Sequence, residues 1–186
     1  MFIRVVRAIV SAWFAVFHPI KVTGREHIPR EGAFILALNH LSFRDAFTAF
    51  LLMPDDAKYM AKKELFRFGP LRWFIQKIGA FPVDRENNDL NAMRTALNVL
   101  KEGHPLVIFP EGHRYGDGQI HEIKPGAAFI ALRAGVPVIP ARIHTHYRPF
   151  CRVRVAVGEP IPAEGKASSE GLRLHTDKIR QGLEAI

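Results

Sequence analysis

The sequence has little of three features that would narrow its class. It contains one cysteine, Cys151, in 186 residues, which excludes an intramolecular disulfide and fits a reducing compartment. It has neither a Gly-x-Ser-x-Gly elbow nor a phosphate-binding P-loop, so neither a serine esterase nor a nucleotide hydrolase is indicated. It also lacks the uncharged apolar run of about 20 residues that a membrane-spanning helix needs.

Positive charge is in excess and lies mainly in the first half of the chain. The net charge is +8, and residues 1–81 hold 12 basic against 6 acidic side chains. This half is also aromatic, above all over residues 66–77, and such a mixture suits an anionic membrane surface. A solvated helix with its aromatic residues in the core explains that segment equally well. A basic chain could also bind nucleic acid, but no nucleic-acid motif is present and we expect no such partner.

The first 17 residues are almost wholly apolar, apart from Arg4, Arg7 and Ser11 on one helical face. The run is too short to span a membrane, and no clear signal-peptide cleavage site follows it. We interpret residues 1–18 as an amphipathic, membrane-associating helix that precedes a single domain over residues 19–186. A helix packed on the domain core is the alternative. We therefore expect a peripheral or monotopic protein on the cytoplasmic face of a membrane.

Strand-like and helix-like segments alternate through the rest of the chain. The periodicity predicts strands over 34–38, 104–109, 136–143 and 153–157, and helices over 46–52, 88–103, 126–135 and 169–186. This alternation predicts an α/β fold with a mixed, mostly parallel sheet that is flanked by helices on both faces.

His40 and Asp45 could form a base with an orienting carboxylate. On a continuous helix they would point away from each other, so the chain must turn between them. His40 follows a predicted strand, and Ser42 with Asp45 fits a capping box at the start of the next helix. Asp45 could then hold one imidazole nitrogen while the other takes a proton. Taken alone, the pair is better explained as a helix cap beside an ordinary turn residue.

A second polar string, Phe109-Pro110-Glu111-Gly112-His113-Arg114, follows the strand predicted at 104–109. The carboxyl ends of strands are where α/β folds build their sites. With the first string, it suggests a hydroxyl activated beside an anion-binding site. His144 and His146 share a face of a predicted strand, but spacing places no third ligand, and we expect no metal.

Four segments, in this order, resemble the motifs of the 1-acylglycerol-3-phosphate acyltransferases and related glycerolipid acyltransferases. Residues 39–45 match the first motif, Asn-His-x4-Asp, and residues 79–85 match the second, a glycine followed by an arginine. Residues 109–114 match the third except at His113, and residues 136–140 match the fourth. A Lys-Pro-Gly-Ala-Ala segment at 124–128 adds to a resemblance that covers roughly residues 20 to 160.

The resemblance implies the glycerolipid acyltransferase fold and a cofactor-free transfer of a fatty acyl group from acyl-CoA or acyl carrier protein. The acceptor would be a hydroxyl of a lysophospholipid, by default 1-acylglycerol 3-phosphate, and the product phosphatidic acid. His40 would be the general base and Asp45 would fix its tautomer. Arg85 and Arg114 would bind the acceptor phosphate, because guanidinium matches phosphate oxygens bidentately.

The third motif carries the remaining site residues. Glu111 would order the acceptor hydroxyls or hold an arginine, and Gly112 would let the backbone approach the substrate. His113 replaces the small hydroxyl residue usual there, which leaves another lysolipid or an aminolipid open as acceptor. A non-enzymatic basic protein that binds lipid or nucleic acid is the alternative from a different class.

Overall fold

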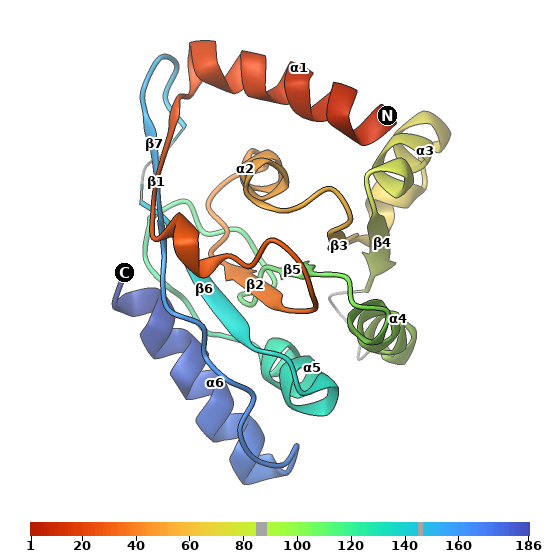
Figure 1. Ribbon diagram of the computed structural model, residues 1–186, viewed down its shortest axis with the longest axis vertical. Coiled ribbons are helices and arrows are strands. Elements are labelled where there is room, and N and C mark those ends of the chain that lie inside the picture. Colours follow the sequence, from red (N-terminus) through yellow and green to blue (C-terminus); the bar gives the residue numbers. More distant parts are fainter. Residues whose placement is uncertain (85–88, 145–146) are drawn as a thin grey trace.

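Seven strands form one mixed sheet in this computed structural model, which describes residues 1–84, 89–144 and 147–186 (Figure 1). The strands run in the order β1-β7-β6-β2-β5-β3-β4, and every pair of neighbours is parallel except β6 with β7. The bounds are β1 Ile20–Thr23, β2 Ile35–Leu38, β3 Lys58–Lys62, β4 Ala80–Val83, β5 Leu106–Ile108, β6 Val138–Ile143 and β7 Val153–Val157. The predicted mixed, mostly parallel α/β sheet is thereby confirmed.

Helices cover both faces of this sheet. They are α1 Phe2–Phe17, α2 Asp45–Leu52, α3 Gly69–Lys77, α4 Leu90–Lys101, α5 Gly126–Ala134 and α6 Ser169–Glu184, with 3-10 turns at η1 Arg25–His27 and η2 Lys63–Phe66. In Figure 1, α4, α5 and α6 lie on one side of the sheet, while α1 and α2 lie on the other. The helices expected near 46–52, 126–135 and 169–186 are therefore present.

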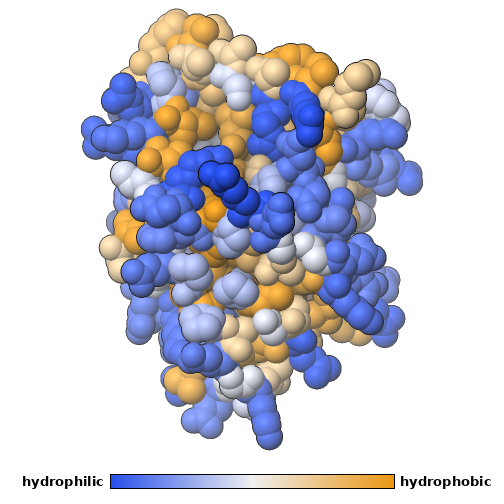
Figure 2. All heavy atoms as spheres, in the orientation of Figure 1, coloured by the Kyte–Doolittle hydropathy of each residue, from blue (hydrophilic) through white to orange (hydrophobic). Residues whose placement is uncertain are grey.

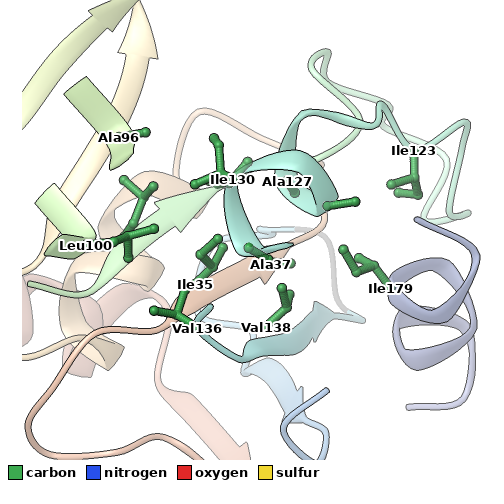
Figure 3. Packing of buried hydrophobic residues seen from close by; sticks show 14 of the residues in the cluster. Ile35, Ala37, Ala96, Leu100, Ile123, Ala127, Ile130, Val136, Val138 and Ile179 are labelled. Atoms are coloured by element: carbon green, nitrogen blue, oxygen red, sulfur yellow. The ribbon is translucent and has the colours of Figure 1, made fainter. Parts of the chain in front are cut away.

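The core is divided by the sheet into two clusters. Strand β2 is buried on both faces, which explains its continuous apolar run. Ile35 and Ala37 point into the cluster under α4, α5 and α6, where Figure 3 shows them facing Ala127 and Ile130 of α5. Residues Phe34, Leu36 and Leu38 alternate with them and join the cluster beneath α2. Both faces of β2 are therefore packed against core residues up to its end, shortly before His40.

Helix α4 differs in detail from its prediction. It begins at Leu90, where the Asp89 side chain accepts a hydrogen bond from the Ala92 backbone at 2.9 Å. Leu90, at the first position of the helix, is 67% exposed. The helix buries Ala92, Ala96, Val99 and Leu100, and the partly buried Met93 and Leu97 pack against the same core cluster. The apolar face of α4 therefore packs on the core from its second turn onward.

Helix α1 presents its apolar side outward. Its inner side packs on the domain through Phe14, which is buried, and through Arg7, whose Nε lies 3.0 Å from an Asp55 carboxylate oxygen. The outer side exposes Val5, Ile9, Trp13 and Val16. Hydrophobic side chains accordingly gather along the top edge in Figure 2, where α1 lies. Within the described ranges, no helix has the length and hydropathy to cross a membrane.

Candidate active site

His40 and Asp45 meet at the C-terminal end of β2, the central strand. The chain turns after His40, and α2 then begins at Asp45. The His40 Nδ1 and the Asp45 Oδ2 lie 2.8 Å apart. Both residues are buried, His40 at 6% exposure and Asp45 at 0%. The predicted contact between the two side chains therefore exists, with Asp45 in the first turn of the helix as expected.

The same carboxylate oxygen also fixes the turn that carries the histidine. Asp45 Oδ2 accepts hydrogen bonds from the backbone N–H groups of Leu41 at 2.6 Å and Ser42 at 2.7 Å. The bond to Ser42 has the form of the carboxylate half of the expected capping box, but the N-cap of α2 is Arg44, and the Ser42 hydroxyl accepts from the Arg44 backbone at 3.3 Å. With Nδ1–H directed at the carboxylate, the imidazole keeps a lone pair on Nε2. Nε2 is therefore the nitrogen that can take a proton.

Asn39 secures the strand end on which His40 stands. Its side-chain Nδ2 donates to the Ile143 carbonyl at 3.1 Å, and its Oδ1 accepts from the Ile143 N–H at 2.7 Å. The amide thus continues the ladder between β2 and β6 by one step beyond Leu38. Asn39 is fully buried, so its role is to hold the histidine backbone rather than to contact a substrate.

Glu111 joins the second string to the first. The carboxylate accepts from the His40 backbone N–H through Oε2 at 2.8 Å and from the His121 backbone N–H through Oε1 at 3.0 Å. The Tyr115 N–H in turn donates to the His40 carbonyl at 2.8 Å. Glu111 is 2% exposed. It therefore fixes the backbone of His40 and of the following loop, a function that its position in the motif did not indicate.

Phe109 packs against the His40 ring and also lines a cavity. Its ring stacks on the His40 ring at a centroid distance of 4.1 Å and an interplanar angle of 22°. The cavity has a volume of about 590 Å³ and lies between β5, α4 and α5. Most of its lining is apolar, including Met60, Met93 and Phe129, and Lys124 contributes a charged side chain. An apolar space of this size therefore begins beside the base.

The remaining residues of the third motif differ in their relation to this cavity. Gly112 lines the cavity and has a positive φ of 72°, and a Cβ there would lie 3.0 Å from the Lys124 side chain. His113 and Arg114 are exposed. Among the described residues, no carboxylate forms an ion pair with Arg114. Arg85, the other predicted phosphate ligand, lies outside the described residues.

No group of three or more His, Cys, Asp and Glu side chains in the described part of the chain is arranged to hold a metal ion. Cys151 is exposed and lies between β6 and β7, far in sequence from β2 and His40. His144 is exposed and its predicted partner His146 lies outside the described residues. The chemistry available at this site is thus that of an oriented imidazole near a largely apolar cavity, whose lining also carries the charged side chains of Asp84, Asp89 and Lys124.

Comparison with known proteins agrees with this arrangement. The family model described as Acyltransferase matches residues 19–144, which include both strings. The chain belongs to the acyltransferase family. It is 32% identical over 179 residues to the 1-acyl-sn-glycerol-3-phosphate acyltransferase of Bacillus subtilis, an alignment that covers 90% of this chain and 87% of that protein. The acyltransferase is also 34% identical over 165 residues to a protein of the same name from Streptococcus pneumoniae, covering 82% of this chain and 60% of that one.

The fold has a counterpart among solved structures. The crystal structure of the 1-acyl-sn-glycerophosphate (LPA) acyltransferase PlsC from Thermotoga maritima superposes with a TM-score of 0.80 at 27% sequence identity. The superposition covers 98% of this chain and 78% of that one, so it includes α1 as well as the sheet. The predicted acyltransferase fold and enzyme class are therefore confirmed.

Proposed function

We propose that this acyltransferase moves a fatty acyl group from a thioester donor, acyl-CoA or acyl carrier protein, to a hydroxyl of a lysophospholipid. The acceptor that we propose first is 1-acylglycerol 3-phosphate, which would give phosphatidic acid. One observation carries the proposal: His40 Nδ1 is held 2.8 Å from Asp45, which leaves Nε2 as a base beside an apolar cavity. The names of the two bacterial relatives support this choice of acceptor.

The reaction would proceed through the histidine alone, without a covalent enzyme intermediate. Nε2 of His40 takes the proton of the acceptor hydroxyl as its oxygen attacks the thioester carbonyl. Asp45 stabilises the imidazolium that results, because its carboxylate is already held against Nδ1. When the tetrahedral intermediate collapses, the C–S bond breaks and the thiolate takes the proton back from Nε2. The products are the acylated lipid and a free thiol.

Cationic side chains would receive the acceptor phosphate. We assign this role to Arg114, which is exposed and makes no ion pair with a described carboxylate, and to Arg85 by its position in the second motif. Lys124 lies across Gly112 and lines the cavity, and we assign it a supporting positive charge for the acceptor. His113 lies between Gly112 and Arg114 in the sequence. Because it is bulkier than the small hydroxyl residue usual at this position, the panel of acceptors must include other lysolipids and aminolipids.

The cavity would hold an acyl chain. Its volume of about 590 Å³ falls within the usual range of roughly 300–1,000 Å³ for ligand pockets. Its walls come from β5, α4 and α5, and the ring of Phe109 separates it from the His40 imidazole. A chain lying here would place its carboxyl end at the Glu111–Gly112 turn, next to the base.

Helix α1 would hold the enzyme on an anionic membrane surface, which the lipid substrates require. Its outward face carries Val5, Ile9, Trp13 and Val16, and the nearby Trp73 of α3 is 56% exposed. Phe2 joins the two helices, since its ring lies 5.6 Å from that of Trp73. The apolar area of α1 and the positive charge of the first half of the chain supply the two contributions to interfacial binding, namely apolar burial and attraction to anionic lipids. We propose a peripheral or monotopic location on the cytoplasmic face.

The catalytic proposal is tested by following thiol release from acyl-CoA and from acyl carrier protein against a panel of lysophospholipids, glycerol 3-phosphate and an aminolipid. We expect turnover with 1-acylglycerol 3-phosphate, and its loss in a folded His40→Ala variant. His104→Ala is the matched control, because His104 lies outside the four motifs and pairs with Asp56 at an exposed position. Turnover that survives in His40→Ala would refute the assignment of the base.

The membrane proposal is tested by co-sedimentation with vesicles that contain phosphatidylglycerol. Ile9→Glu should weaken binding severalfold, because it places a negative charge on the outward face of α1. Leu174→Glu on α6 makes the same change at a comparably exposed leucine, 48% against 64% for Ile9, and should have little effect. Equal binding of the two variants would show that α1 is not the docking surface.

A further inference from the structure

A second polar residue lies behind the histidine–aspartate pair, on the side away from the cavity. The Tyr147 hydroxyl and the Thr48 Oγ1 lie 2.8 Å apart. Thr48 is one helical turn after Asp45 on α2, so both side chains point from the same face of that helix. Thr48 is fully buried. The phenol hydroxyl is therefore anchored next to the carboxylate that orients His40.

The Asp45 carboxylate has one oxygen that the turn does not use. Oδ2 meets His40 Nδ1 and the N–H groups of Leu41 and Ser42. Oδ1 is buried and has no hydrogen-bond partner among the residues that the structure describes. Burial is the main cause that raises the pKa of Tyr147 well above its usual range, and the charge of Asp45 adds to it. The phenol thus stays protonated and can act as a donor.

We propose that Tyr147 is a positioning residue, whose hydroxyl, held by Thr48, donates to Oδ1 of Asp45 and fixes the carboxylate plane. This inference rests on the proposed role of His40 as general base. When His40 takes the proton, Oδ2 must bear most of the attraction to the imidazolium while it still serves two backbone donors. A donor on Oδ1 stops the carboxylate from turning about its Cβ–Cγ bond, so the imidazole keeps the orientation that the reaction needs.

The ring of Tyr147 also ties this arrangement to helix α1. It meets the Phe14 ring edge-on at 6.5 Å and the His18 ring edge-on at 5.6 Å. Phe14 and His18 are each only 2% exposed, so the ring packs into a closed aromatic contact. The position of the hydroxyl therefore depends on how α1 is seated, and the helix with the outward apolar face is linked through one side chain to the catalytic carboxylate.

Tyr147→Phe is the direct test, because it removes the hydroxyl and keeps the ring. With a short-chain donor and a short-chain lysophospholipid, both in solution, kcat should fall roughly tenfold while both KM values stay within about twofold. Thr48→Val should give part of this loss and Thr48→Ser should restore turnover, because only serine keeps the anchoring hydroxyl. A melting temperature close to that of the unmodified protein shows that each variant is folded.

A second comparison tests the link to α1. Phe14→Leu loosens the contact with the Tyr147 ring and should lower kcat on the same soluble substrates, whereas Leu174→Ala, at an exposed position of α6, should not. In a Tyr147→Phe background, Phe14→Leu should have little further effect on kcat, since the hydroxyl is already gone.

The outcomes separate this inference from the proposed function. Unchanged kcat in folded Tyr147→Phe, together with an inactive His40→Ala, would refute the positioning role and leave the base assigned. Turnover retained in His40→Ala would overturn the proposed function itself. If Tyr147→Phe does not fold, the Thr48→Val and Thr48→Ser pair decides, and equal kcat in those two variants would refute the inference.

Discussion

Glu111 offers the sharpest test of how the third motif works, because its contacts assign it to the backbone of the site. Replacement by alanine leaves the N–H groups of His40 and His121 without their acceptor. The His40 N–H is in a buried contact, whereas that of His121 is only partly buried and water can reach it more easily. The two losses should therefore differ, with the greater part arising at His40.

The size of the effect follows from these two bonds. A buried donor left without a partner costs about 1–3 kcal/mol, so Glu111→Ala should reduce the free energy of unfolding by roughly 2–5 kcal/mol. Glu111→Gln keeps one acceptor oxygen but turns an NH₂ group toward the other donor, and should cost about 1–3 kcal/mol. In a chain of this length, each kcal/mol lowers the melting temperature by roughly 2–4 °C, which gives a shift of about 2–12 °C for glutamine.

The loss of activity should rank the two variants in the same order as the loss of stability. Displacement of the His40 backbone moves the base away from the acceptor, so kcat should fall by roughly 10- to 100-fold in Glu111→Ala and by less in Glu111→Gln. The acceptor KM should change little, because both carboxylate oxygens already accept hydrogen bonds from backbone N–H groups. Thermal unfolding followed by circular dichroism, with steady-state kinetics on the folded fraction, measures both quantities. Glu111→Asp is the control, since it keeps the charge but shortens the reach.

The opposite pattern would refute this reasoning. If Glu111→Gln raised the acceptor KM at least tenfold with an unchanged melting temperature, the carboxylate would contact the acceptor hydroxyls, as the resemblance alone suggested. Loss of stability without loss of kcat in the folded fraction would show that the His40 backbone is held well enough by Asn39 and Tyr115.

Three further variants probe the rest of the molecule. Asp45→Asn should reduce kcat by roughly 10²–10⁴-fold in the thiol-release assay, since an amide can no longer stabilise the imidazolium, and a loss below tenfold would contradict that role. Arg114→Ala should raise the acceptor KM with little change in the donor KM, and Arg114→Lys should restore it only partly, whereas a selective rise in the donor KM would move this arginine to the thioester carrier. His175 is buried, and its two ring nitrogens have no hydrogen-bond partner among the described residues. Burial lowers the pKa of His175 in the folded protein, so as the pH falls below about 6.5 the histidine takes up a proton in the unfolded chain before it does so in the folded one. Stability should therefore fall between pH 7 and 5, and His175→Leu should make the melting temperature less dependent on pH over that interval; equal slopes in both proteins would exclude this histidine as the cause.

The contact between His40 and Asp45 could be predicted from the local sequence pattern because the two residues are close in the chain. His40 and Asp45 are five residues apart, and a buried strand followed by a helix start leaves the turn between them little choice. The sheet was harder to predict at its edges. Strands β1, β3 and β4 are only partly buried and carry mixed polar and apolar residues, such as Lys58 and Lys62 at the ends of β3, so their periodicity is weak.

The support of the site depended on contacts that no local pattern contains. Glu111 reaches a backbone N–H 71 residues away, and Tyr147 meets Thr48 across 99 residues. Which backbone donors face a carboxylate is decided by the order of the strands, and that order cannot be obtained from strand positions alone. The exposed apolar face of α1 agrees with the amphipathic helix expected from the sequence, whereas the ion pair of Arg7 with Asp55, which lies beyond α2, could not be read from the local pattern.

The pairing of β1 has a consequence for how the chain is made. Its hydrogen-bonded partner is β7, with Ile20 opposite Val153, so the first strand of the sheet has no neighbour until the last strand has been synthesised. Pairing across such a long stretch of sequence is slow, because the intervening chain must first be ordered. Until then the backbone N–H and C=O groups of β1 have no partner strand. The β1 end of the sheet can therefore close only late in synthesis, after the strands at its centre have been made.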